Sequence, residues 1–158
     1  MVEMNDTLTL YIEDIQEGGS HYEGDIAPKA LDLAVEDLIQ SEQPLHYALD
    51  ATLVSEELLV QGSLQLDLSM RCSRCSVFYP VGVRESAYFF DEQIDETTES
   101  VDLTEDMREA IILAFPSYPV CSSDCKGLCP QCGTNKNTNE CDCKPPDDVR
   151  WAALDGLG

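Results

Sequence analysis

The chain has 158 residues, a length that suits one domain with a small appendage. Hydrophobic residues make up 43% of it, as in ordinary globular proteins, which excludes a chain that is disordered throughout. The 31 acidic and 9 basic residues give a formal net charge of −22, and such a surface repels the phosphate backbone of nucleic acids. The charge therefore favours a basic protein partner over nucleic acid, although plain solubility explains it equally well.

The first eleven residues have neither the basic start nor the apolar stretch of a secretory signal peptide. No apolar run of the sequence approaches the roughly 20 residues that span a membrane. We therefore expect a cytoplasmic protein, whose thiols stay reduced and are more readily metal ligands than disulfides.

The first 40 residues contain three expected elements. Partial alternation of apolar side chains predicts a strand at residues 7–15, and glycines predict a loop at residues 16–25. Residues 28–40 place four apolar side chains at helical spacing, which predicts a short helix.

The clearest pattern is alternation with period two at residues 45–54 and 58–70, separated by a polar turn. A third strand-like run follows at residues 77–90. Period two places one face of a strand on a core and the other toward water. Consecutive strands with short connections predict an antiparallel meander, with the CxxC motif of Cys72 and Cys75 at a hairpin tip, the usual location of a zinc knuckle.

Residues 91–106 contain eight acids and no base, which predicts a mobile loop, either a solvated linker or a docking site for a basic partner. Asp102 and Glu105 could cap a helix over residues 103–114 that ends before Pro116. Met107, Ala110, Ile111 and Ala114 would form the stripe that packs this helix on the sheet.

From residue 121 onward, aliphatic residues almost vanish and Cys, Asn, Gly and Pro dominate. This segment is too poor in apolar residues to build a core, so a metal is expected to order it. A final short helix is expected at residues 147–157, with Trp151 and Leu154 packing back. We therefore divide the chain into an α+β core domain at 1–120 and a cysteine-rich zinc-binding module at 121–158 packed on it.

Four of the eight cysteines form a self-contained pattern, C-x2-C-x8-C-x-C, and a glycine after the second of them accepts a left-handed conformation. The other four could meet in space as a second tetrahedral site. The preferred interpretation is two zinc sites, whose ligands are Cys72, Cys75, Cys121 and Cys125 in one and Cys129, Cys132, Cys141 and Cys143 in the other. A single site with spare cysteines and an iron–sulfur cluster stay open as alternatives.

A thiol-redox protein is the competing interpretation of Cys72 and Cys75, because Arg74 could lower the pKa of a thiolate there. Redox CxxC motifs, however, usually lie at a helix N-terminus after a strand, and here strand-like sequence lies on both sides. No phosphate loop, nucleophile elbow or Ser/His/Asp arrangement is visible in the sequence. We therefore expect a protein that is not an enzyme.

Four segments, at residues 58–75, 101–121, 125–143 and 147–157, resemble the DUF177 or YceD family, the large ribosomal RNA subunit accumulation proteins. The CKGLCPQCG motif at residues 125–133, with the following N-x-N and C-x-C, is the most specific of them. The chain departs from the family at Ser76, where a leucine is usual, at Lys136 and at Val149, and none of these is a cysteine.

The resemblance implies a role in the accumulation of large-subunit rRNA, hence in ribosome assembly, without catalysis. Together with the acidic surface, it favours binding to a basic ribosomal protein or a precursor of the large subunit. It also implies separable metal sites, because some members lack the C-terminal cysteines but keep the first CxxC. Direct contact with rRNA, as in a zinc-ribbon nucleic-acid adaptor, is the alternative. The basic residues near the cysteines are the candidates for it: Arg71, Arg74, Lys126 and Lys136.

Overall fold

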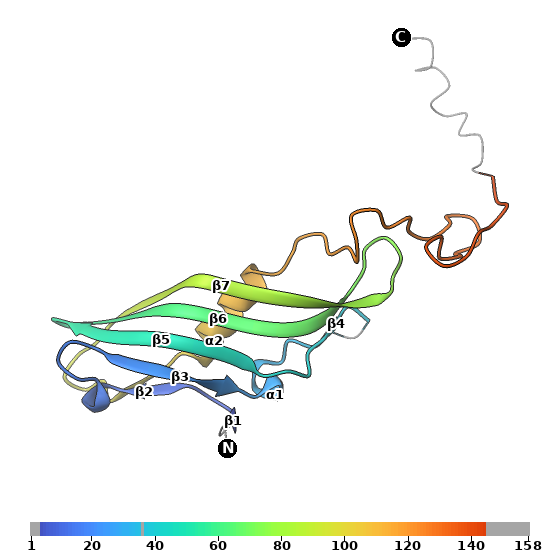
Figure 1. The fold of residues 1–158 in the computed structure, drawn as a ribbon. Coiled ribbons are helices and arrows are strands. Elements are labelled where there is room, and N and C mark those ends of the chain that lie inside the picture. The colour runs from blue at the N-terminus through green and yellow to red at the C-terminus, as the bar shows by residue number, and fades with distance from the viewer. Residues whose placement is uncertain (1–3, 36, 145–158) are drawn as a thin grey trace, which may run out of the picture.

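The computed structural model describes residues 4–35 and 37–144 of the chain. Three long strands form its centre: β5 (Leu45–Val54), β6 (Glu57–Arg71) and β7 (Phe78–Gln93). They pair antiparallel in chain order, as Figure 1 shows. The predicted meander is therefore confirmed, and the first CxxC motif lies in the loop between β6 and β7.

The alternating pattern of β6 places its apolar side chains in the core. Leu64, Leu66 and Leu68 are buried, whereas Gln61 and Asp67 of the same strand are exposed. Burying a leucine side chain stabilises the fold by about 2 kcal/mol relative to leaving it in water. A shift of one residue in the register would reverse the two faces, so the pattern itself holds the strand in place.

Three shorter strands extend this sheet: β1 (Met4–Asn5), β3 (Ser20–Ile26) and β4 (Ile39–Gln40). The sheet order is β1-β3-β5-β6-β4, with β7 paired to β6 and only the β1–β3 pair parallel. The loop predicted at residues 16–25 is wrong from residue 20 onward. Gly24 suggested a loop, but it lies in β3 where a Cβ atom would come within 2.7 Å of the Tyr47 hydroxyl, so the glycine makes room for a neighbouring side chain.

The helix predicted at residues 28–40 is also mostly wrong. Only α1 (Pro28–Leu31) forms, and Asp32 ends it with a left-handed φ of 45°. The side chains of Leu31 and Leu33 are buried, whereas Leu38 is exposed, so the apolar residues do not share one helical face. Tertiary burial of Leu33 has overridden the helical spacing.

A second, two-stranded sheet consists of β2 (Thr9–Tyr11) and β8 (Ser100–Asp102). A 3-10 helix, η1 (Ile12–Asp14), follows β2, so the strand predicted at residues 7–15 is shorter than expected. The acidic stretch 91–106 is not simply a loop, since parts of it lie in β7, β8 and α2. Val101 and Leu103 are buried and supply the apolar contacts that anchor it.

The helix expected near the end of this stretch is confirmed as α2 (Thr104–Leu113), which contacts β6 and β7. The N-cap residue of α2 is Leu103, which provides no side-chain cap, so the cap predicted at Asp102 is not formed as expected. Asp102, one residue earlier, accepts a hydrogen bond from the backbone N–H of Thr104 at 2.9 Å. Glu105 does not complete a capping box, because its carboxylate pairs with Arg108 at 3.1 Å. Met107 and Ile111 form the buried stripe, with Ala110 and Ala114 half-buried beside it.

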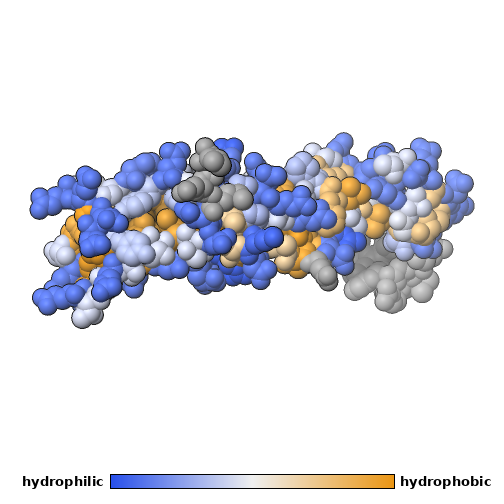
Figure 2. Space-filling model, turned by 90° about the horizontal axis from the view of Figure 1, so that it is seen from below, coloured by the Kyte–Doolittle hydropathy of each residue, from blue (hydrophilic) through white to orange (hydrophobic). Residues whose placement is uncertain are grey.

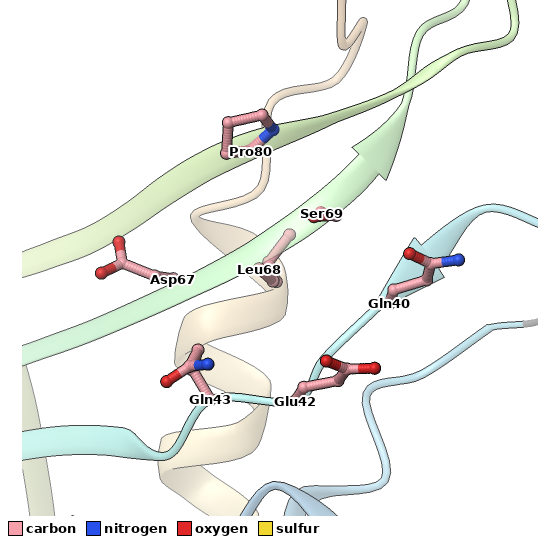
Figure 3. Close-up of a pocket in the computed structure, with 7 residues that line it drawn as sticks. All are labelled: Gln40, Glu42, Gln43, Asp67, Leu68, Ser69 and Pro80. Atoms are coloured by element: carbon pink, nitrogen blue, oxygen red, sulfur yellow. The ribbon is translucent and has the colours of Figure 1, made fainter.

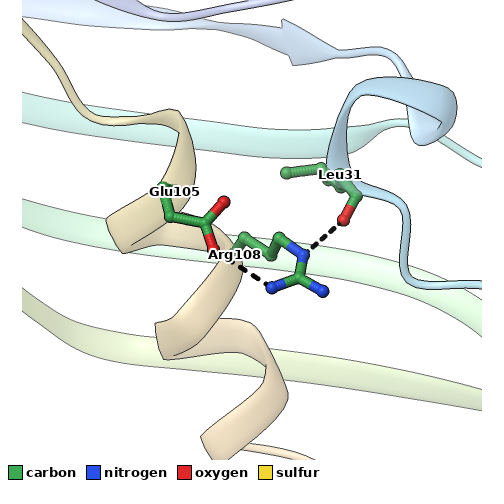
Figure 4. A network of polar contacts seen from close by, with 3 residues as sticks. All are labelled: Leu31, Glu105 and Arg108. Carbon is green, nitrogen blue, oxygen red and sulfur yellow. Dashed lines mark hydrogen bonds and ion pairs between the residues drawn. The ribbon is translucent and has the colours of Figure 1, made fainter.

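Arg108 joins α2 to α1. Its Nε donates a hydrogen bond of 2.7 Å to the carbonyl oxygen of Leu31, while Glu105 holds the other end of the guanidinium (Figure 4). The last carbonyls of a helix have no partner within the helix, so this contact satisfies one of them in α1.

These elements confirm the α+β class, an antiparallel sheet with packed helices. Hydrophilic side chains cover most of the face in Figure 2, with apolar areas between them. Among the described residues, none of the helices has the length and hydropathy needed to cross a membrane. The helix expected at residues 147–157, with Trp151 and Leu154, lies outside the described residues.

Candidate metal centres

The first cysteine group begins in the loop between β6 and β7. The backbone N–H of Cys72 bonds to the carbonyl of Val77 at 2.9 Å, and the N–H of Ser76 bonds to the carbonyl of Cys72 at 2.9 Å. These two bonds fold the loop tightly and require a left-handed residue after Cys75, which is Ser76 with a φ of 61°. Both sulfurs consequently point to one side of the loop, toward the segment that follows α2.

Cys121 and Cys125 of that segment complete the first group. The N–H of Ser73 bonds to the carbonyl of Pro119 at 2.8 Å and brings the segment against the loop. The Sγ atoms of Cys75 and Cys121 are 3.7 Å apart, and those of Cys72 and Cys125 are 3.9 Å apart. Cys121 is exposed, and the other three cysteines are buried.

The second group repeats the backbone geometry of the first. The N–H of Cys129 bonds to the carbonyl of Thr134 at 2.8 Å, and the N–H of Gly133 bonds to the carbonyl of Cys129 at 2.9 Å. Gly133 has a φ of 74°, which confirms the left-handed conformation predicted for it. Cys141 and Cys143 close this group, in which only Cys129 is buried.

Sulfur spacing shows what each group could hold. In both groups the four sulfurs lie within 4.8 Å of one another. The S···S distances of the first group are far longer than the roughly 2.05 Å of a disulfide. They agree with the roughly 3.8 Å that follows from a tetrahedral ion with Zn–S bonds of about 2.3 Å. The eight cysteines therefore form two groups of four, each of which could hold a metal ion.

The electrostatics of each group favour a cation. Burial opposes ionisation of Cys72, but N–H groups from Cys75, Cys121 and Arg74 outweigh it and lower its pKa to about 6. Burial, with hydrogen bonds from neighbouring thiols, raises the pKa of Cys121 to about 12. One cysteine of the group thus ionises readily, and its negative charge opposes ionisation of the next cysteine. A divalent cation would stabilise several thiolates in one group.

The second group shows the same division. Hydrogen bonds from the side chain and backbone of Thr134 lower the pKa of Cys132 to about 6. The hydrogen bond with Cys132, followed by burial, raises the pKa of Cys143 to about 12. The donor set of four sulfurs is the one that structural zinc takes.

Asn137 connects the two groups, and no sequence pattern singled it out beyond its place in the N-x-N motif between Cys132 and Cys141. Its side-chain amide donates to Cys125 Sγ at 3.3 Å, and its side-chain oxygen accepts the N–H of Lys126 at 2.8 Å. Gly127 lies against Arg74, whose carbonyl would be 3.0 Å from an added Cβ atom. The segment between the groups is therefore folded back on the β6–β7 loop.

Two of the four basic candidate residues have partners within the chain. Arg74 donates to the carbonyl oxygens of Ser123 and Cys125 at 3.2 and 3.3 Å, so it supports the first group. Arg71 donates to the carbonyl of Asp37 at 3.3 Å. Lys126 and Lys136 are exposed, and within the described residues neither forms an ion pair.

The CxxC motif of Cys72 and Cys75 lies between two strands and not at a helix N-terminus. Both thiols are buried, at 2% and 4% exposure, which hinders the access that thiol exchange requires. This arrangement supports a structural role over the redox alternative.

One pocket of the fold, of about 200 Å³, lies between β6, β7 and the segment after β4 (Figure 3). Its lining residues are Gln40, Glu42, Gln43, Asp67, Leu68, Ser69 and Pro80. They include no histidine or lysine that could activate Ser69, so we assign no chemistry to this pocket.

Comparison with known proteins gives a family match and no structural one. The family model described as large ribosomal RNA subunit accumulation protein YceD matches residues 60–158, more than half of the chain. No solved structure matches the chain.

Three relatives illustrate the match. An uncharacterized protein of Mycobacterium tuberculosis is 34% identical over 115 residues, which cover 64% of this chain and 56% of that protein. The chain thus spans about half the length of this relative. The large ribosomal RNA subunit accumulation protein YCED homolog 1, chloroplastic, of Zea mays is 42% identical over 60 residues, 37% of this chain and 20% of that protein. Its Arabidopsis thaliana counterpart is 36% identical over 45 residues, 28% of this chain and 14% of that protein.

Proposed function

This chain belongs to the YceD family of large ribosomal RNA subunit accumulation proteins, and we propose that it is a non-catalytic assembly factor. In this proposal it acts in the cytoplasm, holds two zinc ions and supports the accumulation of large-subunit rRNA. It does so by binding a basic ribosomal protein or a precursor of the large subunit.

The positions of the sulfur atoms in the two cysteine groups support the proposal that the protein binds zinc. Structural zinc supplies on the order of 10 kcal/mol of folding free energy to a segment that lacks a core. In the first group, zinc would join the β6–β7 loop to residues 121 and 125, so that the module at 121–158 is held on the core domain at 1–120. In the second group, zinc would order the module itself.

The distribution of charge supports a basic protein partner. The net charge of −22 disfavours rRNA as the direct ligand. Of the basic residues near the cysteines, Arg71 and Arg74 bond to carbonyl oxygens of the chain and are less available for phosphate. The effect on rRNA would then be indirect. The protein would bring its partner to the precursor of the large subunit, or protect the partner there.

Affinity capture of the full chain from cells, with mass spectrometry of the proteins and sequencing of the RNA, tests this proposal. We expect ribosomal proteins of the large subunit or its precursor rRNA to be enriched, and deletion of the gene to lower the ratio of large- to small-subunit rRNA. Capture of neither, with an unchanged ratio, would contradict the proposal.

A double variant separates a protein partner from direct rRNA contact. The double substitution Lys126→Ser and Lys136→Ser removes exposed cations and spares Arg74, which supports the first cysteine group. Unchanged particle association supports a protein partner. A loss of association, together with steep salt dependence of RNA binding, would favour the zinc-ribbon adaptor.

A further inference from the structure

A groove of about 310 Å³ runs between β7 and α2, away from both cysteine groups. We call it the β7–α2 groove. Its lining residues are Glu85, Ala87, Tyr88 and Phe89 of β7 and Asp106, Glu109, Ala110 and Leu113 of α2. Neither the family resemblance nor the metal centres account for it.

Leu113, on the α2 side of the groove, is unusually accessible. Its side chain is 85% exposed, while Met107 and Ile111 of the same helix are fully buried. Ile112, next to Leu113, is also exposed. Apolar side chains that gather at the surface in this way are typical of a contact surface for another molecule.

The groove is also strongly acidic. Three of its lining residues are carboxylates, Glu85, Asp106 and Glu109, and none is basic. Arg108, which is close to Glu109 in sequence, directs its guanidinium to Leu31 and Glu105. Within the described residues Glu109 forms no ion pair, so its charge is available to a ligand.

Hydrogen bonds hold the groove in shape. The hydroxyl of Tyr88 donates to Asp106 at 2.6 Å and fixes β7 against α2. The register of β6 and β7 shifts between Gly62 and Leu64, and at this irregularity the N–H of Ala87 bonds to the Glu85 carboxylate at 2.8 Å. A groove that is formed before binding loses less conformational entropy when a ligand enters.

We propose that the β7–α2 groove binds a lysine- or arginine-rich segment of a protein. An apolar side chain of that segment contacts Leu113, and its cationic side chains lie beside Glu85, Asp106 and Glu109. The proposal rests on the proposed function, from which it takes a basic protein as partner. RNA is disfavoured because the carboxylates repel phosphate, and a second copy of the chain would place two sets of these carboxylates together.

Photocrosslinking of the full zinc-loaded chain in cells tests the proposal. The photoreactive residue p-benzoylphenylalanine replaces Leu113, and in the control it replaces Leu38, which is 55% exposed, directly precedes β4 and does not line the groove. A crosslink at position 113 to a lysine- or arginine-rich protein segment supports the proposal. A crosslink there to RNA, to a second copy or to a neutral or acidic segment overturns it, as does a yield no higher than at position 38.

A second measurement uses a defined probe, a fluorescein-labelled peptide of repeating lysine and leucine, and follows its fluorescence anisotropy. We expect Leu113→Ser and Glu109→Gln each to weaken binding by about fivefold, while Leu38→Ser and Glu17→Gln leave it unchanged. Equal affinities in all four variants, or equally tight binding of a lysine-only peptide, overturn the proposal.

The two measurements separate failure of the groove from failure of the proposed function. If the chain captures large-subunit particles but position 113 gives no specific crosslink, the groove is wrong and the proposed function stands. If no particle is captured but the peptide discriminates the variants as expected, the groove stands and the ribosomal role is wrong.

Discussion

The side-chain amide of Asn137 donates a hydrogen bond to the Sγ atom of Cys125 across 3.3 Å. Asn137 lies within the second cysteine pattern, between Cys132 and Cys141, whereas Cys125 belongs to the first group. The two groups are therefore not independent, because Asn137, which lies between ligands of the second group, orients Cys125, a ligand of the first. This bond is also the main cause that lowers the pKa of Cys125.

Replacing Asn137 by alanine should weaken metal binding in the first group by about tenfold, because hydrogen bonds to metal ligands orient them and spread their charge. The measurement is competition for zinc with a chromophoric chelator in the otherwise unchanged chain, in which the second group stays intact and a change in only one of the two binding steps is read. Asn139→Ala is the matched control, since the Asn139 amide bonds to Thr138 and not to a sulfur. Equal affinities of the two variants would show that the amide has no role at the site.

The two groups should lose metal in a fixed order when a chelator is added. Three ligands of the first group are buried, whereas Cys132 and Cys143 of the second are exposed. A chelator reaches exposed sulfurs first, so we expect one metal to be released quickly and the other slowly. Cys132→Ser should remove the fast phase and Cys75→Ser the slow one. A single phase in the parent chain would argue against two distinct sites.

Ser76 and Gly133 occupy equivalent left-handed positions, with φ values of 61° and 74°. A side chain in this conformation costs about 1 kcal/mol or more, and a glycine avoids that cost but adds freedom to the unfolded chain. Ser76→Gly should therefore raise the free energy of unfolding by up to about 1 kcal/mol, measured by urea denaturation of the zinc-loaded chain.

Gly133→Ser is the reciprocal change. Nothing lies within 4 Å of a Cβ atom built on Gly133, so the substitution adds backbone strain without a clash. We expect it to weaken zinc binding in the second group alone. Loss of metal from the first group in this variant would mean that the effect is not local.

The pKa of Tyr88 is raised, first by burial and then by its contact with Asp106. In the unfolded chain a tyrosine ionises near pH 10. The unfolded state therefore releases a proton above about pH 10 while the folded state keeps it, so this contribution to stability is present below that pH and is lost as the pH rises. Tyr88→Phe should lower stability at neutral pH by about 1 kcal/mol but flatten the decline above about pH 10.

Urea midpoints measured from neutral pH to above about pH 10 would show this difference. Tyr118→Phe, which alters an exposed tyrosine, is the control and should follow the parent chain. A decline in Tyr88→Phe as steep as in the parent would contradict the assignment.

Much of the fold follows from local patterns. Alternation located β5 and β6, because each has one buried and one solvated face, and the strand-like run at residues 77–90 located β7. Asp102 located the start of α2 closely because its carboxylate bonds to the N–H of Thr104, the first residue of the helix, although Leu103 is the N-cap. The CPQCG motif predicted its own left-handed glycine for the same reason.

The sequence-based predictions of local structure are wrong where contacts between residues distant in the sequence determine the structure. Gly24 suggested a loop, but it lies in β3. A glycine fits there because Tyr47 of the neighbouring strand occupies the space that a side chain would take. The spacing of residues 28–40 suited a helix, but burial of Leu33 depends on the assembled core. The hydrogen bond between Asn137 and Cys125 depends on the tertiary fold of a segment with few apolar residues. A hydrophobic pattern in the sequence therefore cannot predict it.

Metal analysis of the purified, reduced full chain bears on the whole proposal, since the module at 121–158 is proposed to be ordered by metal. Native mass spectrometry with elemental analysis should find two zinc ions per chain. Cys72→Ser and Cys132→Ser should each leave one. A parent chain that carries no metal, or that loses both ions when either cysteine is replaced, would contradict two zinc sites with four sulfurs each.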